Sequence, residues 1–215
     1  MTEPDFLRDT RASYNAIATA YAEHFKTEIH DKPMDRAMLA VFAELVQATG
    51  NTDVVDIGCG PGRVTARLNS LGLNAFGIDL SSEMVALARR EHPGLRFEEG
   101  SMTALELPDG ELGGISAWYS TIHIPRVQLP AVFAGFHRIL AAGGYLVLAF
   151  QVGDGLVHYD EGFGHEVSLN FYRRTPDHIA DLLGQAGFEM RARVVRERDA
   201  EEKTPQAYLL TRKPA

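Results

Sequence analysis

The stretch VVDIGCGPGR, residues 54–63, decides the fold of this chain. Its apolar run is interrupted by Asp56, and three glycines then follow at alternate positions, Gly58, Gly60 and Gly62. Glycine between a strand and a helix permits positive φ angles and lets a ligand touch bare backbone. Three such glycines indicate a binding loop, whereas a single one would fit any tight turn. The stretch therefore predicts a strand, a ligand-binding loop and a helix, in this order.

The segments beyond this stretch alternate between strand and helix patterns. Five short strands are expected, at residues 52–57, 74–79, 95–100, 113–120 and 143–150. An apolar stripe at residues 129–140 predicts a helix, and Thr175 caps a last helix that ends at Gly187. Two final strands, 188–195 and 206–212, flank a short polar segment, which favours an antiparallel pair. The order predicts an α/β fold with a doubly wound, seven-stranded, mostly parallel sheet.

The length of 215 residues suits one domain with a small appendage. Helical periodicity at residues 5–25 and 33–49 predicts two N-terminal helices that lie over one edge of the sheet. We therefore expect an N-terminal helical cap, residues 1–50, and a Rossmann-like unit, residues 51–215. Residues 152–174 are long for a connector, and such loops often act as lids or binding elements. We interpret them as an insertion on the substrate side.

Composition narrows the function classes. The formal charge of -8 argues against a nucleic-acid partner. The start of the chain lacks the pattern of a signal peptide, and the longest apolar stretch, residues 139–152, is too short to cross a bilayer. The single cysteine, Cys59, has no partner for a disulfide or a zinc site, so we interpret it as a small residue in a tight turn. We expect a cytoplasmic monomer or homodimer without a metal or a membrane partner.

The spacing of the glycines excludes the most familiar nucleotide loops. The dinucleotide fingerprint needs a third glycine three positions after Gly60, where this chain has Arg63. The phosphate-binding P-loop needs a Lys-Ser or Lys-Thr pair, which is also missing. Asp79, at the end of the second strand, can accept hydrogen bonds from both hydroxyls of a ribose. The expected ligand therefore has a ribose but no pyrophosphate.

These motifs resemble those of the class I S-adenosylmethionine-dependent methyltransferases. VVDIGCGPGR and GIDLSSEMVALAR, residues 77–89, are similar to the first two motifs of the family, and EGSMTALELPDG, residues 99–110, is similar to the third. Residues 138–150 and 171–189 resemble later segments of the family. SYNAIATAYAEHF, residues 13–25, resembles the helix that precedes the fold in many members that act on small molecules.

The resemblance implies S-adenosylmethionine as the cofactor and assigns a role to each matching residue. Asp56 would attract the ammonium of the methionine moiety, and Asp79 would bind the ribose. Met84 would pack on the adenine face with its polarisable sulfur. The remaining residues that the resemblance places around the cofactor are Gly58, Cys59, Gly60, Leu80, Ser101, Met102, Tyr119 and Ser120.

Tyr14 and Tyr21 are seven residues apart and share one face of a helix. They either pack this helix onto the sheet or close over the cofactor, with an aromatic face near the sulfonium charge. In the second interpretation Tyr14 is the direct contact.

Methyl transfer is an in-line displacement that depends mainly on alignment. A protonated nucleophile also needs a base, and His123 in STIHIP is the candidate; many relatives have a histidine here, although it could instead order its loop. The insertion carries the expected substrate-binding residues, Tyr159, Phe163, His165 and Tyr172. We therefore expect methyl transfer to oxygen or nitrogen of a small, partly apolar acceptor. The alternatives are a nicotinamide-dependent oxidoreductase and a nonenzymatic cofactor-binding protein.

Overall fold

The computed structural model describes residues 3–199 and 202–215. The main sheet has seven strands in the order β3-β2-β1-β4-β5-β9-β8. Its strands are β1 (Asp53–Ile57), β2 (Asn74–Asp79), β3 (Phe97–Glu99), β4 (Leu112–Trp118), β5 (Leu140–Gln151), β8 (Glu189–Arg196) and β9 (Gln206–Arg212). The first five in this order pair in parallel, whereas β9 runs antiparallel to both β5 and β8. The predicted fold class is confirmed, including the antiparallel final pair.

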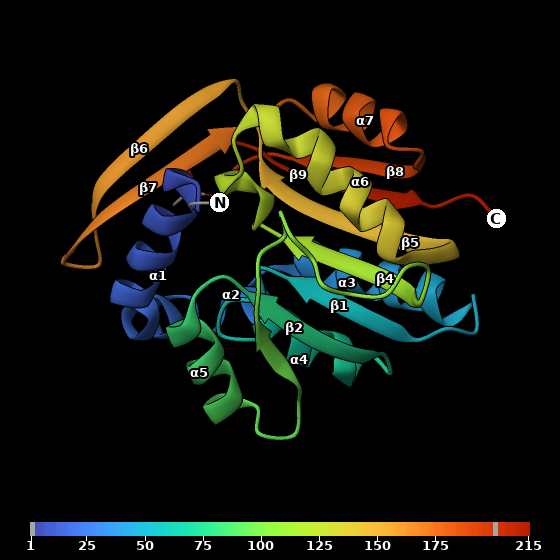
Figure 1. Cartoon of the computed structure of the whole chain (residues 1–215), viewed down its shortest axis with the longest axis horizontal. Helices are drawn as coiled ribbons and strands as arrows, with labels where there is room; N and C mark the ends of the chain where they lie inside the picture. The colour runs from blue at the N-terminus through green and yellow to red at the C-terminus, as the bar shows by residue number, and fades with distance from the viewer. Residues whose placement is uncertain (1–2, 200–201) are drawn as a thin grey trace.

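Helices cover both faces of the sheet (Figure 1). They are α1 (Asp5–His24), α2 (Glu28–Asp31), α3 (Pro33–Gln47), α4 (Arg63–Ser70), α5 (Ser82–Glu91), α6 (Leu129–Ile139) and α7 (Pro176–Gln185), with 3₁₀ turns η1 (Thr121–His123) and η2 (Arg126–Gln128). The predicted Thr175 cap is present, because Thr175 Oγ1 accepts a hydrogen bond from the His178 N–H. Ser81 caps α5 in the same way, since its Oγ accepts from the Met84 N–H. Among the described residues, no helix has the length and apolar character that a bilayer span requires.

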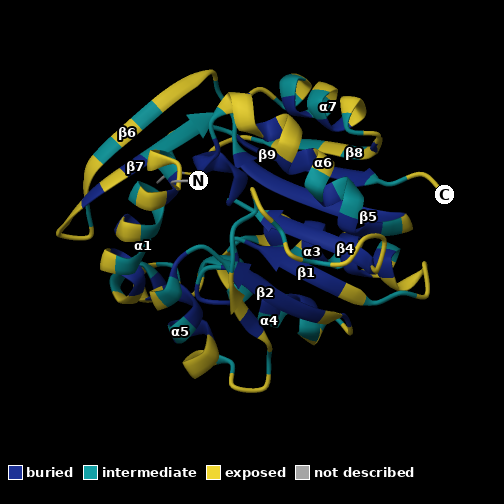
Figure 2. Ribbon diagram, viewed as in Figure 1, coloured by how far each residue is buried: buried dark blue, intermediate teal, exposed yellow. Residues whose placement is uncertain are grey.

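The core lies on the two faces of the central strands, most of whose residues are buried (Figure 2). Successive residues of a strand point to opposite faces, so Val54 packs with Phe42 of α3, and Val55 belongs to the cluster that contains Phe133 of α6. The expectation that both N-terminal helices lie over one edge is wrong. The helix α3 packs on a face of the sheet, and α1 packs on α5 and on the strand β7 described next. The division of the chain at residue 50 stays a prediction.

The insertion at residues 152–174 is a β-hairpin rather than a loop. The strands β6 (Gly155–Gly162) and β7 (His165–Arg173) form a separate two-stranded antiparallel sheet. Phe163 and Gly164 form its two-residue turn, and their φ angles are 52° and 76°. A two-residue hairpin turn needs positive φ angles at both positions, and the sequence pattern expected for it is Asn-Gly, Asp-Gly or Gly-Gly. A phenylalanine at the first position does not match this pattern. The hairpin projects beyond the main sheet and lies beside α1 (Figure 1).

Candidate active site

A cavity of about 630 Å³ opens at the carboxyl ends of the central strands. It lies where the strand order reverses between β1 and β4, which is the ligand position expected for an open α/β sheet. The glycine loop and the end of β2 form one part of the wall. Other parts of the wall come from α1, α2, the segments after β3 and β4, the hairpin and the segment before β9.

Gly58 and Gly60, the first two glycines of the loop, are required for different physical reasons. Gly58 has a φ of +73°, and a Cβ there would lie 2.2 Å from the Cβ of Ser120, so packing within the protein excludes a side chain. Gly60 has a φ of +54°, and a Cβ there would meet nothing within 4 Å. The bare backbone at Gly60 therefore faces open cavity, as a ligand-binding loop requires.

Asp79 is held against this loop by backbone hydrogen bonds. Its Oδ2 accepts from the Gly60 N–H at 2.7 Å, and its Oδ1 accepts from the Ser81 N–H at 2.8 Å. Burial raises the pKa of this carboxyl, and the two backbone donors act in the opposite direction. A carboxylate has about four acceptor positions, so about two are left for hydroxyl groups of a ligand.

Asp56 is buried at the floor of the same cavity. Its Oδ2 accepts from the Thr65 hydroxyl at 2.8 Å, whereas Oδ1 has no hydrogen-bond partner among the described residues. Burial raises the pKa of Asp56 to about 6. A buried carboxylate oxygen without a donor suits a cationic group such as an ammonium.

The other residues expected around the cofactor all line this cavity, namely Cys59, Leu80, Met84, Ser101, Met102, Tyr119 and Ser120. Ser120 Oγ and Tyr119 Oη are buried and have no hydrogen-bond partner among the described residues. Burial raises the pKa of the Cys59 thiol well above its ordinary value, which agrees with a small packing residue and not with a nucleophile.

Tyr14 and His123 meet across the cavity. The Nδ1 of His123 lies 2.9 Å from the carbonyl of Asn170, which can only accept, so Nδ1 carries the hydrogen. The other ring nitrogen, Nε2, then accepts from the Tyr14 hydroxyl at 2.8 Å. Burial lowers the pKa of His123 to about 4 and raises that of Tyr14 well above its ordinary value. The pair is therefore a neutral imidazole and a protonated phenol at neutral pH.

Tyr21 contributes to an aromatic wall. Its ring lies edge-on to Tyr14 at 5.7 Å and packs on Phe25 at 4.6 Å between ring centres. The guanidinium of Arg63 lies 5.7 Å from the centre of the Tyr21 ring. Both predicted tyrosines thus line the cavity while they pack α1 against neighbouring elements, so the two interpretations of the sequence are compatible.

The hairpin contributes two of the four residues predicted to bind substrate. Tyr159 and Phe163 line the cavity, whereas His165 and Tyr172 do not. His165 is exposed beside the turn, and the Tyr172 ring faces the guanidinium of Arg174. Side chains alternate along a strand, so Tyr172 points away from the face that Phe171 presents to the cavity. We therefore remove His165 and Tyr172 from the proposed set.

Two residues of α1 that sequence reasoning missed fix the loop after β2. Arg11 Nε donates to the Leu80 carbonyl at 3.2 Å. Asn15 Oδ1 accepts from the Ser81 hydroxyl at 2.6 Å. Both contacts join residues more than sixty positions apart, and no local pattern indicates them.

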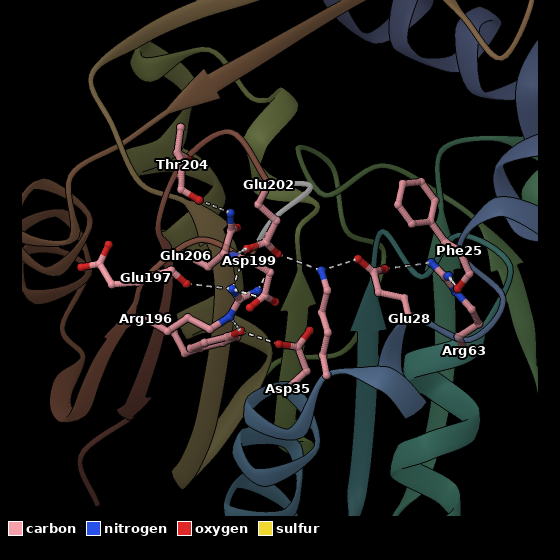
Figure 3. A network of polar contacts seen from close by, with 12 residues as sticks. Phe25, Glu28, Asp35, Arg63, Arg196, Glu197, Asp199, Glu202, Thr204 and Gln206 are labelled. Atoms are coloured by element: carbon pink, nitrogen blue, oxygen red, sulfur yellow. Dashed lines mark hydrogen bonds and ion pairs between the residues drawn. The ribbon is translucent and has the colours of Figure 1, made fainter.

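A charged network includes the cavity-lining residues Glu28, Lys32 and Glu202 (Figure 3). Lys32 Nζ lies 3.0 Å from Glu28 and 2.9 Å from Glu202, and Arg196 lies 2.6 Å from Glu202. Burial alone would raise the pKa of Glu202, but hydrogen bonds from Arg196, Asp199 N–H and Lys32 lower it to about 2. The network ties the segment before β9 to α2 and to the start of α3.

Comparisons with known proteins agree with this geometry. Residues 54–144 match a family described as a methyltransferase domain. The malonyl-[acyl-carrier protein] O-methyltransferase of Pectobacterium atrosepticum is 32% identical over 146 residues, which cover 66% of this chain and 56% of that protein. The S-adenosyl-L-methionine-dependent Diels-Alderase iliD of a Neonectria species is 29% identical over 170 residues, or 73% of this chain and 67% of that protein. The chain thus spans little more than half of the first relative.

A solved structure extends the likeness to the whole fold. The Burkholderia thailandensis 1,6-didemethyltoxoflavin-N1-methyltransferase, with bound 1,6-didemethyltoxoflavin and S-adenosylhomocysteine, superposes with a TM-score of 0.73 at 19% identity. The match covers 100% of this chain and 92% of that one. At this identity the likeness supports the architecture, and the chemistry has to be argued from the cavity itself.

Proposed function

Because the chain belongs to the class I S-adenosylmethionine-dependent methyltransferases, we propose that it transfers a methyl group to oxygen or nitrogen of a small-molecule acceptor. The observation that carries this proposal is the placement of Asp79. Its carboxylate is bound to the N–H of Gly60 beside open, unsubstituted backbone, at the wall of a cavity large enough for a cofactor and a small acceptor.

The residues present fit the cofactor. Asp79 has acceptor positions left for the ribose hydroxyls, and the unpartnered Oδ1 of Asp56 suits the ammonium of the methionine moiety. Met84, Ser101 and Met102 would hold the adenine. Bound there, the cofactor supplies an electrophilic methyl group on a sulfonium, and the protein's task is to align the acceptor with it.

Arg63 argues against the oxidoreductase alternative. It occupies the position at which a dinucleotide fingerprint has its third glycine. Its guanidinium lies 5.6 Å from the centre of the Phe25 ring and 3.7 Å from Glu28. A bulky side chain at this position prevents the close packing of helix on strand that the third glycine of the fingerprint permits.

We propose that His123 receives the acceptor's proton through the Tyr14 hydroxyl. His123 Nε2 is the unprotonated nitrogen of a neutral imidazole, and it accepts from Tyr14, which lines the cavity. The low pKa of His123, about 4, makes it a weak base. This suits an acceptor whose proton becomes acidic as the methyl group is transferred.

Replacing Tyr14 with phenylalanine should lower the turnover rate about tenfold, because one hydrogen bond that fixes the base and its proton path is lost. Cofactor affinity should change much less. The comparison is initial rates of methyl transfer in Tyr14→Phe and in Tyr172→Phe, whose hydroxyl lies outside the cavity. Equal rates in native protein and Tyr14→Phe would remove the proposed proton path.

The function itself is tested by incubating the protein with methyl-labelled S-adenosylmethionine and a small-molecule extract, followed by mass detection of the labelled product. Label should appear in small molecules. Label only in macromolecules would contradict the acceptor class. Tight S-adenosylhomocysteine binding without any methyl transfer would favour a role without methylation. The relative named as an S-adenosyl-L-methionine-dependent Diels-Alderase is a precedent, because its name gives an activity other than methyl transfer.

A further inference from the structure

Arg173 breaks the apolar pattern on the inner face of the hairpin. Along β7 the residues that line the cavity are Val167, Leu169 and Phe171, and the next position on that face is Arg173. Its neighbour Arg174 is explained by the fold, because this buried guanidinium donates to the carbonyls of Thr121 and Ile124. No such explanation applies to Arg173.

Among residues 3–199 and 202–215, no hydrogen-bond or ion-pair partner of the Arg173 side chain is found, and its Nε is a buried donor without a partner. Arg173 is half-buried, and a buried donor such as its Nε normally has a hydrogen-bond partner, because an unsatisfied buried polar group is costly. The stem of Arg173 passes close to the backbone of Gly153, since a Cβ on Gly153 would lie 3.1 Å from both its Cβ and its Cδ. The chain thus holds an unpaired cation in the wall of the cavity.

Two acidic residues of the cavity wall, Glu202 and Glu161, either form ion pairs with other residues or lie far from Arg173. Glu202 pairs with Arg196 and Lys32. In the register of the hairpin strands, Glu161 lies opposite Glu166 near the turn, whereas Arg173 lies opposite Gly155 at the base. Seven strand positions separate Glu166 from Arg173, which corresponds to about 23 Å. Neither Glu202 nor Glu161 therefore competes with a ligand carboxylate for Arg173.

Arg173 also lies away from the part of the cavity assigned to the cofactor. The next residue, Arg174, donates from its backbone N–H to the carbonyl of Gln151 at the end of β5, and Gln151 pairs with Gln206 at the start of β9. The strand β5 is two places from β1 in the sheet, or about 10 Å from the glycine loop. The cavity wall also includes the aromatic rings of Trp118, Tyr159 and Phe171.

We propose that the methyl acceptor carries a carboxylate and an apolar, preferably aromatic, body, and that Arg173 binds the carboxylate. The planar guanidinium can donate two parallel hydrogen bonds to the two oxygens of such a group. Lys203, exposed at the cavity rim with its Nζ 3.0 Å from the Tyr159 hydroxyl, adds positive charge on the approach to the site. This inference rests on the proposed function and specifies its substrate class.

The test uses Trp118, the single tryptophan of the chain, as a fluorescent reporter in the cavity wall. The protein, saturated with S-adenosylhomocysteine, is titrated with 4-hydroxyphenylacetate and with the corresponding neutral amide. The acid should bind about tenfold more tightly than the amide, and Arg173→Gln should abolish this difference. Arg191→Gln, which removes an exposed arginine of β8, is the matched control and should keep it.

Equal binding of acid and amide by native protein, or a preference that survives in Arg173→Gln, would overturn the proposal. If neither probe binds, an acceptor extract is separated by anion exchange before the labelling reaction. Label arising only from the fraction that the column does not retain overturns it, and label from the retained fraction supports it.

The carboxylate that Arg173 binds could also be that of the methionine moiety of the cofactor. Calorimetry with S-adenosylhomocysteine separates the two sources. Unchanged affinity in Arg173→Gln supports the acceptor, and a tenfold loss would assign Arg173 to the cofactor instead. Native protein that binds neither S-adenosylmethionine nor S-adenosylhomocysteine would reject the proposed function itself, which is a distinct result.

Discussion

Replacing Asp79 with alanine should weaken S-adenosylmethionine binding about 100-fold, or by about 2.7 kcal/mol. The carboxylate is buried, and about two of its acceptor positions remain after the N–H groups of Gly60 and Ser81 are bound. Hydrogen bonds to a charged group contribute about 1.5–3 kcal/mol each, so losing two ribose contacts at the lower end of this range costs about 3 kcal/mol, close to the expected effect. Isothermal titration calorimetry with S-adenosylmethionine and S-adenosylhomocysteine measures it directly.

The control for Asp79→Ala is Asp53→Ala. Asp53 begins β1, is exposed, and accepts from the Asn74 side chain at 2.6 Å, outside the cavity. Its loss should leave cofactor affinity unchanged. Because Asp79 also orders the loop, circular dichroism and thermal unfolding should accompany the titration. A folded Asp79→Ala variant with native affinity would show that this carboxylate does not bind the cofactor.

The cofactor side of the site could be predicted because it is local in sequence. The carboxyl ends of β1 and β2 are adjacent in any parallel pairing, so Gly60 and Asp79 had to meet once the two strands were recognised. The same holds for the Ser81 cap, which depends on residues three positions apart. Short-range pattern and strand order together were sufficient here.

The acceptor side depends on docking between distant segments, and sequence patterns could not give it. Tyr14 meets His123 across 109 positions of the chain. The aromatic character of Tyr172 predicts a place in the site, but strand alternation turns it outward and turns Arg173 inward. Recognising the hairpin first would have corrected this, since the period of two decides which residues share a face. The sequence does not reveal the hairpin, because its two-residue turn has a phenylalanine, Phe163, before Gly164.

The second large effect concerns the pH dependence of the free energy of unfolding. Two buried groups of the site, Asp56 and His123, should contribute to it with opposite signs, so that their effects largely cancel in the native protein. Burial raises the pKa of Asp56 from 3.8 to about 6, so the folded state keeps a proton that the unfolded state has lost. The stability from this group is present below pH 4 and is lost as the pH rises through 6. Burial lowers the pKa of His123 from 6.5 to about 4. Its stability is present above pH 6.5 and is lost as the pH falls through 4.

Each shift corresponds to about 3 kcal/mol of free energy of unfolding, with opposite sign over the same interval. Relative to native protein, Asp56→Asn should therefore lose about 3 kcal/mol of stability between pH 7 and pH 4, and His123→Gln should gain about as much. Urea unfolding at pH 4, 5, 6 and 7 yields both difference curves, and surface carboxylates cancel because all the proteins share them.

Asp79 titrates in every protein of this series, and its own pKa is raised by burial. It shifts slightly in Asp56→Asn, because removing one carboxylate relieves repulsion on the other. The double variant, Asp56→Asn with His123→Gln, separates this coupling, since its curve should return close to that of native protein. If His123→Gln follows the native curve throughout, His123 is not held neutral by burial, and the proton path through Tyr14 loses its base.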